Sequence, residues 1–170
     1  MIGLIRIAGA ALISLAVVLV GLLVMKRQKL RIIQLSQCVE LIQTIAAEIS
    51  YGNHPIGEIL QNAARNEAFS ALDFLPHVAE GSLVGFAEEW KRRIETAPTL
   101  AMKTEEKAIL IRFGKSLGTT DTQTQLILCE RYRAQLNGKL TQAADHRAEY
   151  TRLTLGGTAV AALILFALML

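Results

Sequence analysis

The last part of the chain, TDTQTQLILCERYRAQLNGKLTQAADHRAEYTRLTLGGTAVAALILFALML (residues 120–170), decides the fold. It contains no proline, and its last charged side chain is Arg152. A helix needs about 20 apolar residues, with a working range of about 17–25, to cross the hydrocarbon core of a bilayer. Residues 153–170 meet that requirement, so the stretch predicts one long helix that starts in water and ends in a membrane. Asn137-Gly138 is its weakest point, because a glycine inside a helix costs about 1 kcal/mol, and a kink there stays an open alternative.

The other end of the chain has the same arrangement in reverse. Residues 7–25 carry no charge, and all fifteen acidic residues and all but one of the eighteen basic residues lie in the span 26–152. A cleavable signal peptide is the alternative interpretation, since Arg6 and the amino terminus would form its basic start. No small-residue cleavage site follows, and the basic residues that begin at Lys26 oppose translocation. The pattern favours a retained anchor.

The distribution of basic residues also predicts orientation. Four basic residues follow the first predicted span, Arg147 and Arg152 precede the second, and none follows the second. By the positive-inside rule the segment 26–152 faces the cytoplasm and both termini face outward. Cys38 and Cys129 would then lie in a reducing compartment, where a disulfide is not expected. The basic residues are neither continuous nor interleaved with aromatic residues, so they indicate a membrane surface rather than a nucleic acid.

Between the anchors, hydrophobic periodicity predicts a helical bundle, and no strand-like alternation of useful length occurs. The apolar side chains of residues 28–49 recur at spacings of three and four, which places Leu35, Cys38, Ile42, Ile45 and Ile49 on one buried stripe. The buried face of the last helix is expected to contain Cys129, Tyr132, Leu136, Leu140 and Ala143. The predicted fold is all-α, with an N-terminal transmembrane helix at 1–25, a cytoplasmic helical bundle at 26–152 and a C-terminal transmembrane helix at 153–170.

Capping chemistry predicts where the shorter helices begin and end. Gly52 and Gly118 suit helix termini. Pro55 fits the first turn of the helix that follows residue 53, and Pro76 is expected to end that helical region. The expected N-cap residues of the three later helices are Ser82, Thr104 and Thr120, the last paired with Gln123 in a capping box.

Signals for catalysis or metal binding are weak. The three histidines lie far apart in sequence and none has a cysteine nearby, which argues against a metal site. Cys38 and Cys129 fall on buried stripes, where cysteine behaves as a small hydrophobe. Gly114-Lys115-Ser116 lacks the glycine that a phosphate-binding loop requires at position 109, and a helix rather than a strand precedes it. Glu88-Glu89 and Glu105-Glu106 are interpreted as solvated faces or helix starts. No catalytic, cofactor-binding or metal-binding residue is therefore predicted.

One predicted turn is a candidate for a binding surface. Residues 48–56, EISYGNHPI, join two predicted helices with polar and aromatic side chains. The simpler interpretation is a capped turn with Tyr51 packed beneath it. The alternative is a partner-binding corner, because loops held by rigid helices often carry recognition.

Taken together, several short motifs resemble the stage III sporulation protein AB family of endospore-forming bacteria, over essentially the whole chain. The first is Glu48-Ile49-Ser50-Tyr51-Gly52 followed by Pro55-Ile56, where the family has Glu-Ile-x-Tyr-Gly-x-x-Pro-Leu. The second is Trp90 in the middle of the predicted bundle. The third is Phe113-Gly114-Lys115-Ser116-Leu117-Gly118 with Asp121 and Gln125, which resembles the family's Phe-Gly-x-x-Leu-Gly-x-x-Asp-x-x-x-Gln. Each motif alone is weak, and their order and spacing are more specific. The chain departs from the family at Ile56, and it lacks a proline expected after the first span. The residues that carry the resemblance are Glu48, Tyr51, Gly52, Pro55, Trp90, Phe113, Gly114, Leu117, Gly118, Asp121 and Gln125.

The resemblance implies a non-enzymatic membrane platform in the channel-like complex that links mother cell and forespore. It also implies a soluble domain similar to the cytoplasmic helical domain of the type II secretion F platform protein. The expected partners are the membrane, the cytoplasmic secretion-type ATPase of the complex and its other membrane components, with homo-oligomerisation left open; no cofactor or nucleic acid is expected. Two other classes were weighed: a small two-span holin-like or stress protein, which predicts no folded cytosolic domain, and a membrane-bound enzyme, which predicts a polar cluster converging inside the bundle.

Overall fold

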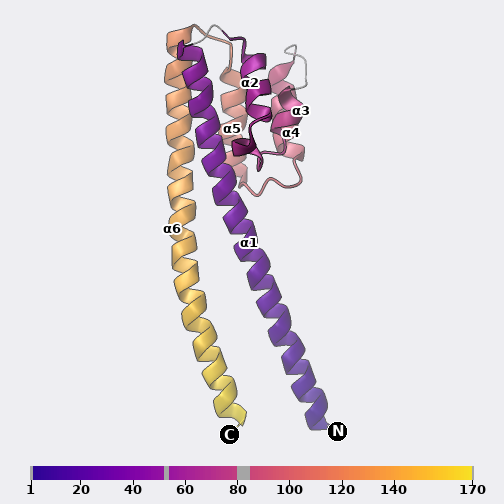
Figure 1. The fold of residues 1–170 in the computed structure, drawn as a ribbon. Helices are drawn as coiled ribbons and strands as arrows, with labels where there is room; N and C mark the ends of the chain where they lie inside the picture. Colours follow the sequence, from indigo (N-terminus) through magenta and orange to yellow (C-terminus); the bar gives the residue numbers. More distant parts are fainter. Residues whose placement is uncertain (1, 52–53, 80–84, 170) are drawn as a thin grey trace.

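The computed structural model of the chain describes residues 2–51, 54–79 and 85–169, and for 2–15, 17, 18, 79 and 148–169 it describes the backbone alone. Two long helices, α1 (Ile2–Tyr51) and α6 (Thr122–Met169), run antiparallel beside each other and make the most extensive helix–helix contact of the fold (Figure 1). α1 begins and α6 ends at the same, lower end of the molecule in this view (Figure 1).

The shorter elements pack beside the upper half of the long pair (Figure 1). In chain order they are α2 (Ile56–Ala64), the 3₁₀ turn η1 (Glu67–Phe69), α3 (Leu75–Ala79), α4 (Phe86–Thr96) and α5 (Thr104–Ser116). The described residues contain no β-strand, so they confirm the all-α prediction.

The predicted apolar stripes form the core between the long helices. On α1, Leu35, Cys38, Ile42 and Ile45 are fully buried, and on α6, Cys129, Leu136 and Ala143 are buried. Ile49, Tyr132 and Leu140 pack against this core and are partly exposed. The periodicity of the sequence therefore identified the faces of both long helices correctly, because one apolar stripe per helix is all that two packed helices need to bury.

Trp90 of α4 is the centre of a second, aromatic part of the core. Its ring lies 5.5 Å from that of Phe74, 5.6 Å from that of Phe86 and 6.3 Å from that of Phe113. Its indole Nε1–H donates to the Leu110 carbonyl at 2.8 Å. Gly114 makes this contact possible, since a Cβ at that position would lie 2.2 Å from Trp90 Cδ1. Helix α5 thus exposes bare backbone to the indole ring.

Gln34 of α1 fixes two connecting segments to the long helix. Its side-chain amide donates to the carbonyls of Ala71 and Thr99, each at 3.1 Å, and accepts from the Ala101 N–H at 2.8 Å. The side chain is fully buried. Buried backbone groups outside helices need such partners, because water does not reach them. Periodicity did not single out this residue, since a glutamine on the apolar face of a helix carries no signal of what it will bind.

Several helix boundaries differ from the predictions. Pro76 does not end a helix: it is the second residue of α3, where a missing N–H is harmless because the first turn leaves its N–H groups unpaired. Pro55 is the N-cap residue of α2 and precedes its first turn. The segment 65–74, expected to continue that helix, consists of turns and η1.

The N-caps of the later helices are also displaced. Lys103, rather than Thr104, is the N-cap of α5, and its N–H donates to Glu106 Oε2 at 2.7 Å. Asp121, rather than Thr120, caps α6 by accepting from the Thr124 N–H at 3.1 Å. In both cases the acceptor carboxylate lies three residues from the donor N–H, which is the geometry that satisfies an unpaired helix N–H group. Gly118 adopts φ +71°, as its predicted terminating role requires.

Other predictions fall partly or wholly outside the described residues. Gly52 and Ser82 are not described; the helix expected after Ser82 begins at Phe86 and follows Gly85, whose φ is +77°. α6 continues as a helix through Asn137-Gly138.

The predicted membrane spans are described in part only. Among the described residues, none of the helices contains a segment that is both long enough and apolar enough to cross a bilayer. Most of the side chains in the predicted spans at 1–25 and 153–170 lie outside the description. The backbone of α1 and α6 runs through residues 25–26 and 152–153 without a break.

Candidate functional site

The two main motif regions of the sequence meet at the end of the bundle that lies opposite the termini (Figure 1). α1 ends at Tyr51 and α6 begins at Thr122 on this side. A Cβ placed on Gly118 would lie 3.1 Å from Ile56 Cδ1, so the turn before α6 packs directly on the start of α2. We call this region, formed by residues 48–51, 54–58 and 117–125, the distal corner.

The inner motif residues are core residues. Trp90, Phe113 and Gly114 are buried, and Leu117 is 6% exposed. Phe113 also makes an edge contact with the Tyr132 ring, with 5.8 Å between centroids, which links α5 to α6. These side chains hold α4, α5 and α6 together and are not available to a partner.

A second group of motif residues shapes the turn between α5 and α6. Gln125 is buried, and its Oε1 accepts from the Gly118 N–H at 3.0 Å and from the Thr120 hydroxyl at 3.5 Å. Hydrogen bonds from the Thr124 side chain and N–H hold the pKa of Asp121 below its ordinary value. Gly118, Asp121 and Gln125 therefore lock the turn onto the first turn of α6.

The remaining described motif residues are exposed. Glu48 and Pro55 face solvent, and the Tyr51 side chain is 93% exposed. His54 Nδ1 lies 3.5 Å from Glu58 Oε2. The interpretation of Tyr51 as a ring packed beneath the turn was wrong, because Tyr51 is almost fully exposed. The geometry favours the alternative, a corner that presents an aromatic ring to a partner.

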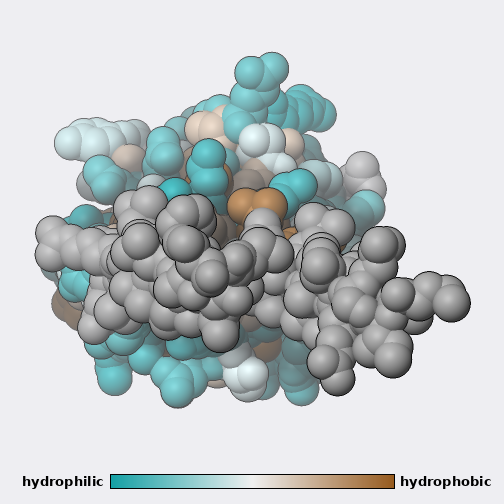
Figure 2. Space-filling view, turned by 90° about the horizontal axis from the view of Figure 1, so that it is seen from below, coloured by the Kyte–Doolittle hydropathy of each residue, from teal (hydrophilic) through white to brown (hydrophobic). Residues whose placement is uncertain are grey.

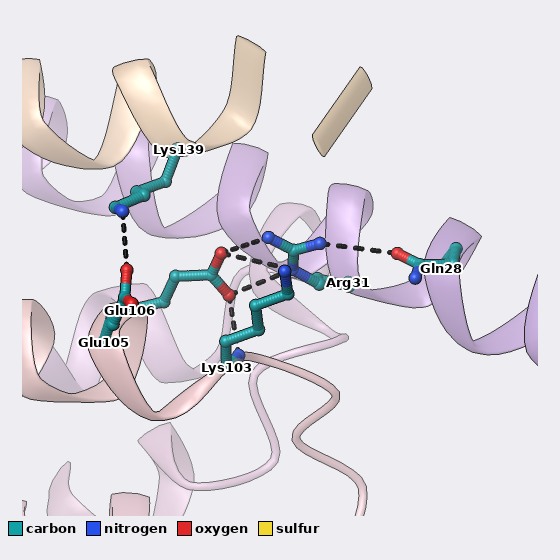
Figure 3. Close-up of polar contacts among 6 residues, drawn as sticks. All are labelled: Gln28, Arg31, Lys103, Glu105, Glu106 and Lys139. Carbon is teal, nitrogen blue, oxygen red and sulfur yellow. Dashed lines mark hydrogen bonds and ion pairs between the residues drawn. The ribbon is translucent and has the colours of Figure 1, made fainter. Parts of the chain in front are cut away.

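Sequence reasoning missed a buried ion pair at the opposite end of the short helices (Figure 3). Glu106 was interpreted as part of a solvated face or a helix start. It does lie in the first turn of α5, but it is 1% exposed and forms a salt bridge with Arg31 of α1. Arg31 Nε donates to both Glu106 oxygens at 3.1 Å, and Arg31 Nη1 lies 3.4 Å from Gln28 Oε1. The capping position of Glu106 was visible in the sequence, but nothing in it pairs residues 75 positions apart.

The cysteines are buried, and the carboxylates that the structure describes do not gather with them into a cluster. Both cysteines are buried and free. Burial, with a smaller contribution from Glu106, raises the pKa of the Cys38 thiol to about 12, which leaves it almost wholly protonated at neutral pH. Among the residues that the structure describes, no three metal-ligating side chains converge. Neither cysteine is therefore an activated nucleophile.

Comparison with known proteins gives one match. The family model described as stage III sporulation protein AB (spore_III_AB) matches residues 6–170. No curated protein and no solved structure matches the chain. The family match covers both motif regions of the distal corner, the aromatic core around Trp90, α1 from residue 6 onward and all of α6.

Proposed function

This chain belongs to the stage III sporulation protein AB family, and on that premise we propose that it is a non-enzymatic membrane platform of a sporulation channel between mother cell and forespore. The family indicates a sporulation-related protein. The platform role, the membrane anchoring and the partner are the proposal.

The observation that carries the proposal is that α1 begins and α6 ends on the same side of the bundle (Figure 1). The sequence of both terminal segments is uncharged over a length that matches a bilayer core. Two such ends on one side allow both helices to enter the same membrane from the same face. The bundle then stands on the cytoplasmic side, as the basic residues that flank both segments favour.

The distal corner is the surface we propose for the cytoplasmic secretion-type ATPase of the complex. Tyr51 lies 26 residues after Met25 along an unbroken helix, about 39 Å at a rise of 1.5 Å per residue, so it is far from the proposed membrane. An exposed aromatic ring on a rigid helix end is the kind of anchor that dominates binding energy at protein interfaces. The locked turn at 117–121 places a fixed surface beside it.

The two long helices supply a mechanical link. α1 and α6 each run from the distal corner to the proposed membrane as one helix, and they pack along a shared apolar core. A force or displacement applied at the corner is therefore carried by packed helices rather than by a loop. This is the property that a platform between an ATPase and a membrane complex requires.

The packed core does not favour the two-span alternative, which predicted no folded domain. The enzyme alternative predicted converging polar groups inside the bundle. The buried charged groups among the described residues are Arg31 and Glu106, which pair with each other, so they do not support it either.

A binding experiment tests the proposed partner. The full-length chain in a neutral detergent is immobilised, and the ATPase of the same complex is titrated over it. Tyr51→Ala should weaken binding by at least about 30-fold, the effect of losing a hot-spot side chain worth about 2 kcal/mol. It should leave the melting temperature unchanged, because the ring is exposed.

Two variants serve as controls. Ile33→Ala removes another exposed apolar side chain from α1, 39% exposed and well below the corner, and should bind normally. Phe113→Ala should lose binding together with stability, since it empties a core position. Equal binding by wild type and Tyr51→Ala would refute the corner as the docking surface. Normal sporulation after deletion of the gene would remove the platform role itself.

A further inference from the structure

A pocket of about 490 Å³ lies between α1 and the segment that leads into α5. Its polar lining consists of Arg27, Gln28, Arg31, Lys103, Thr104 and Glu105. We call it the basic pocket. The start of α5, which lines it, lies at the end of the short helices that faces the termini, whereas the distal corner lies at the other end (Figure 1).

The charges of this pocket do not cancel. Arg31 is paired with Glu106, which reaches it from α5 (Figure 3). Glu105 accepts a hydrogen bond from Lys139 of α6 at 2.7 Å, and this contact is the main reason why the pKa of Glu105 is lowered. Arg27 makes no ion pair among the described residues, and Lys103 is exposed. Two positive charges therefore remain for an anionic ligand.

The pocket lies at the level where lipid headgroups are expected. The part of α1 that lines the pocket, from Arg27 to Arg31, follows Met25, the last residue of the predicted span, by two to six residues, about 3–9 Å along the helix. Headgroups occupy a layer of roughly 5–8 Å on each side of the hydrocarbon core. Seen from below, the coloured rim of the domain carries mostly hydrophilic residues, which suits a surface that faces headgroups (Figure 2).

We propose that the basic pocket binds the headgroup phosphate of an anionic phospholipid; this inference rests on the membrane anchoring proposed above. Arg27 and Lys103 supply the charge, and Gln28 and Thr104 supply neutral hydrogen-bonding groups. Basic pockets beside membrane helices on the cytoplasmic side are suited to such headgroups. A lipid held between α1 and the start of α5 fixes the bundle against the bilayer and so sets the position of the distal corner.

The test uses the full chain in a neutral detergent, with dioctanoyl phosphatidylglycerol as the probe. Hydrogen exchange of the amides at 99–107 is followed as the lipid is added. The wild-type chain should show slower exchange at these amides, and dioctanoyl phosphatidylcholine should not produce this protection. The double variant Arg27→Gln/Lys103→Gln should need about 30-fold more phosphatidylglycerol, because each basic residue near an anionic surface contributes about fivefold.

The matched control is Arg65→Gln/Lys115→Gln, which removes two exposed basic residues outside the pocket and should respond like the wild type. Circular dichroism checks that both double variants are folded. Equal protection by the two lipids, or an unchanged response of the Arg27/Lys103 variant, overturns the proposal. Equal protection by soluble glycerol phosphate would overturn the lipid as the source of the phosphate.

A separate measurement distinguishes this proposal from the anchoring on which it rests. The full chain is mixed with phosphatidylcholine vesicles and floated on a density gradient. Flotation without phosphatidylglycerol-dependent protection refutes the basic pocket and leaves the anchor intact. Failure to float refutes the anchor, and with it the lipid assignment of the pocket.

Discussion

Replacing Gly114 by alanine should destabilise the bundle, although alanine is the better helix former. A Cβ at this position would lie 2.2 Å from Trp90 Cδ1, 2.4 Å from Nε1 and 2.5 Å from Cγ, whereas ordinary contact begins at 3.4 Å. The indole ring or the α5 backbone has to move by about 1 Å in a close-packed core. Neither moves freely, since Trp90 is fully buried, contacts three other aromatic rings and is hydrogen-bonded to Leu110.

The expected size follows from two opposing effects. Overpacking a well-packed core costs about 1–3 kcal/mol, and the distances here place the cost near the upper limit. Exchanging glycine for alanine inside a helix contributes about 1 kcal/mol of stability. The net loss should be about 2 kcal/mol, a fall in melting temperature of roughly 4–12 °C for a domain of this size.

Gly138 is the matched control for this experiment. It also lies inside a helix, and a Cβ there would meet nothing within 4 Å. Gly138→Ala should therefore stabilise the protein by about 0.5–1 kcal/mol. Urea unfolding of the full chain in neutral detergent, followed by the fluorescence of Trp90, measures both variants. If Gly114→Ala is as stable as the wild type, or if both variants shift in the same direction, the close packing of Trp90 on α5 is wrong.

Three further changes test the buried polar groups. Glu106→Gln should lower the free energy of unfolding by about 3–5 kcal/mol, because the buried Arg31 guanidinium loses its counter-charge. Chemical denaturation measures this loss. If the double variant Arg31→Met/Glu106→Leu regains the stability, the unpaired charge is the cause. Gln34→Leu should lower the free energy of unfolding by at least about 3 kcal/mol, since three backbone groups lose their hydrogen-bond partner. The control Gln43→Leu, at an exposed position, should change it by less than about 0.5 kcal/mol. Equal melting temperatures for the two variants would contradict the role of Gln34. The raised Cys38 pKa gives a pH dependence: its stabilising effect is complete below the ordinary thiol pKa of 9 and is lost as the pH rises toward about 12. Stability measured from pH 8 to 10.5 should fall more steeply for the wild type than for Cys38→Ala, and parallel curves would exclude this thiol as the cause.

The sequence predicted the long helices and their buried faces because periodicity is a local property of one helix. The stripe through Leu35, Cys38, Ile42 and Ile45 and the face containing Cys129 and Leu136 both proved correct. The sequence also predicted Gly118 as a helix terminator, and its positive φ agrees with that role. Helix boundaries were less accurate, because neighbouring residues such as Thr120 and Asp121 offer equivalent caps and only the three-dimensional turn selects one.

For the candidate site, the sequence identified the residues and the structure assigned their roles. The motif residues could be found in the sequence, but their roles could not: Trp90 and Phe113 are buried, whereas Tyr51 of the same set is 93% exposed. Whether an aromatic ring at a helix end packs or projects depends on where the next helix returns, which is a tertiary property. The Arg31–Glu106 pair, the Gln34 hydrogen bonds and the basic pocket each join residues far apart in the chain.

By itself, the sequence determined the helical class, the two uncharged ends, the confinement of charge to 26–152 and the family resemblance. These features depend on composition, on spacing within single helices and on the order of short motifs. Only the tertiary structure decided that α1 begins and α6 ends on one side, that the motif regions meet at the distal corner and that Arg27 and Lys103 line one pocket. The physical reason is that these features depend on how separate helices pack, and packing is settled by buried side chains such as Trp90, whose partners come from several elements at once.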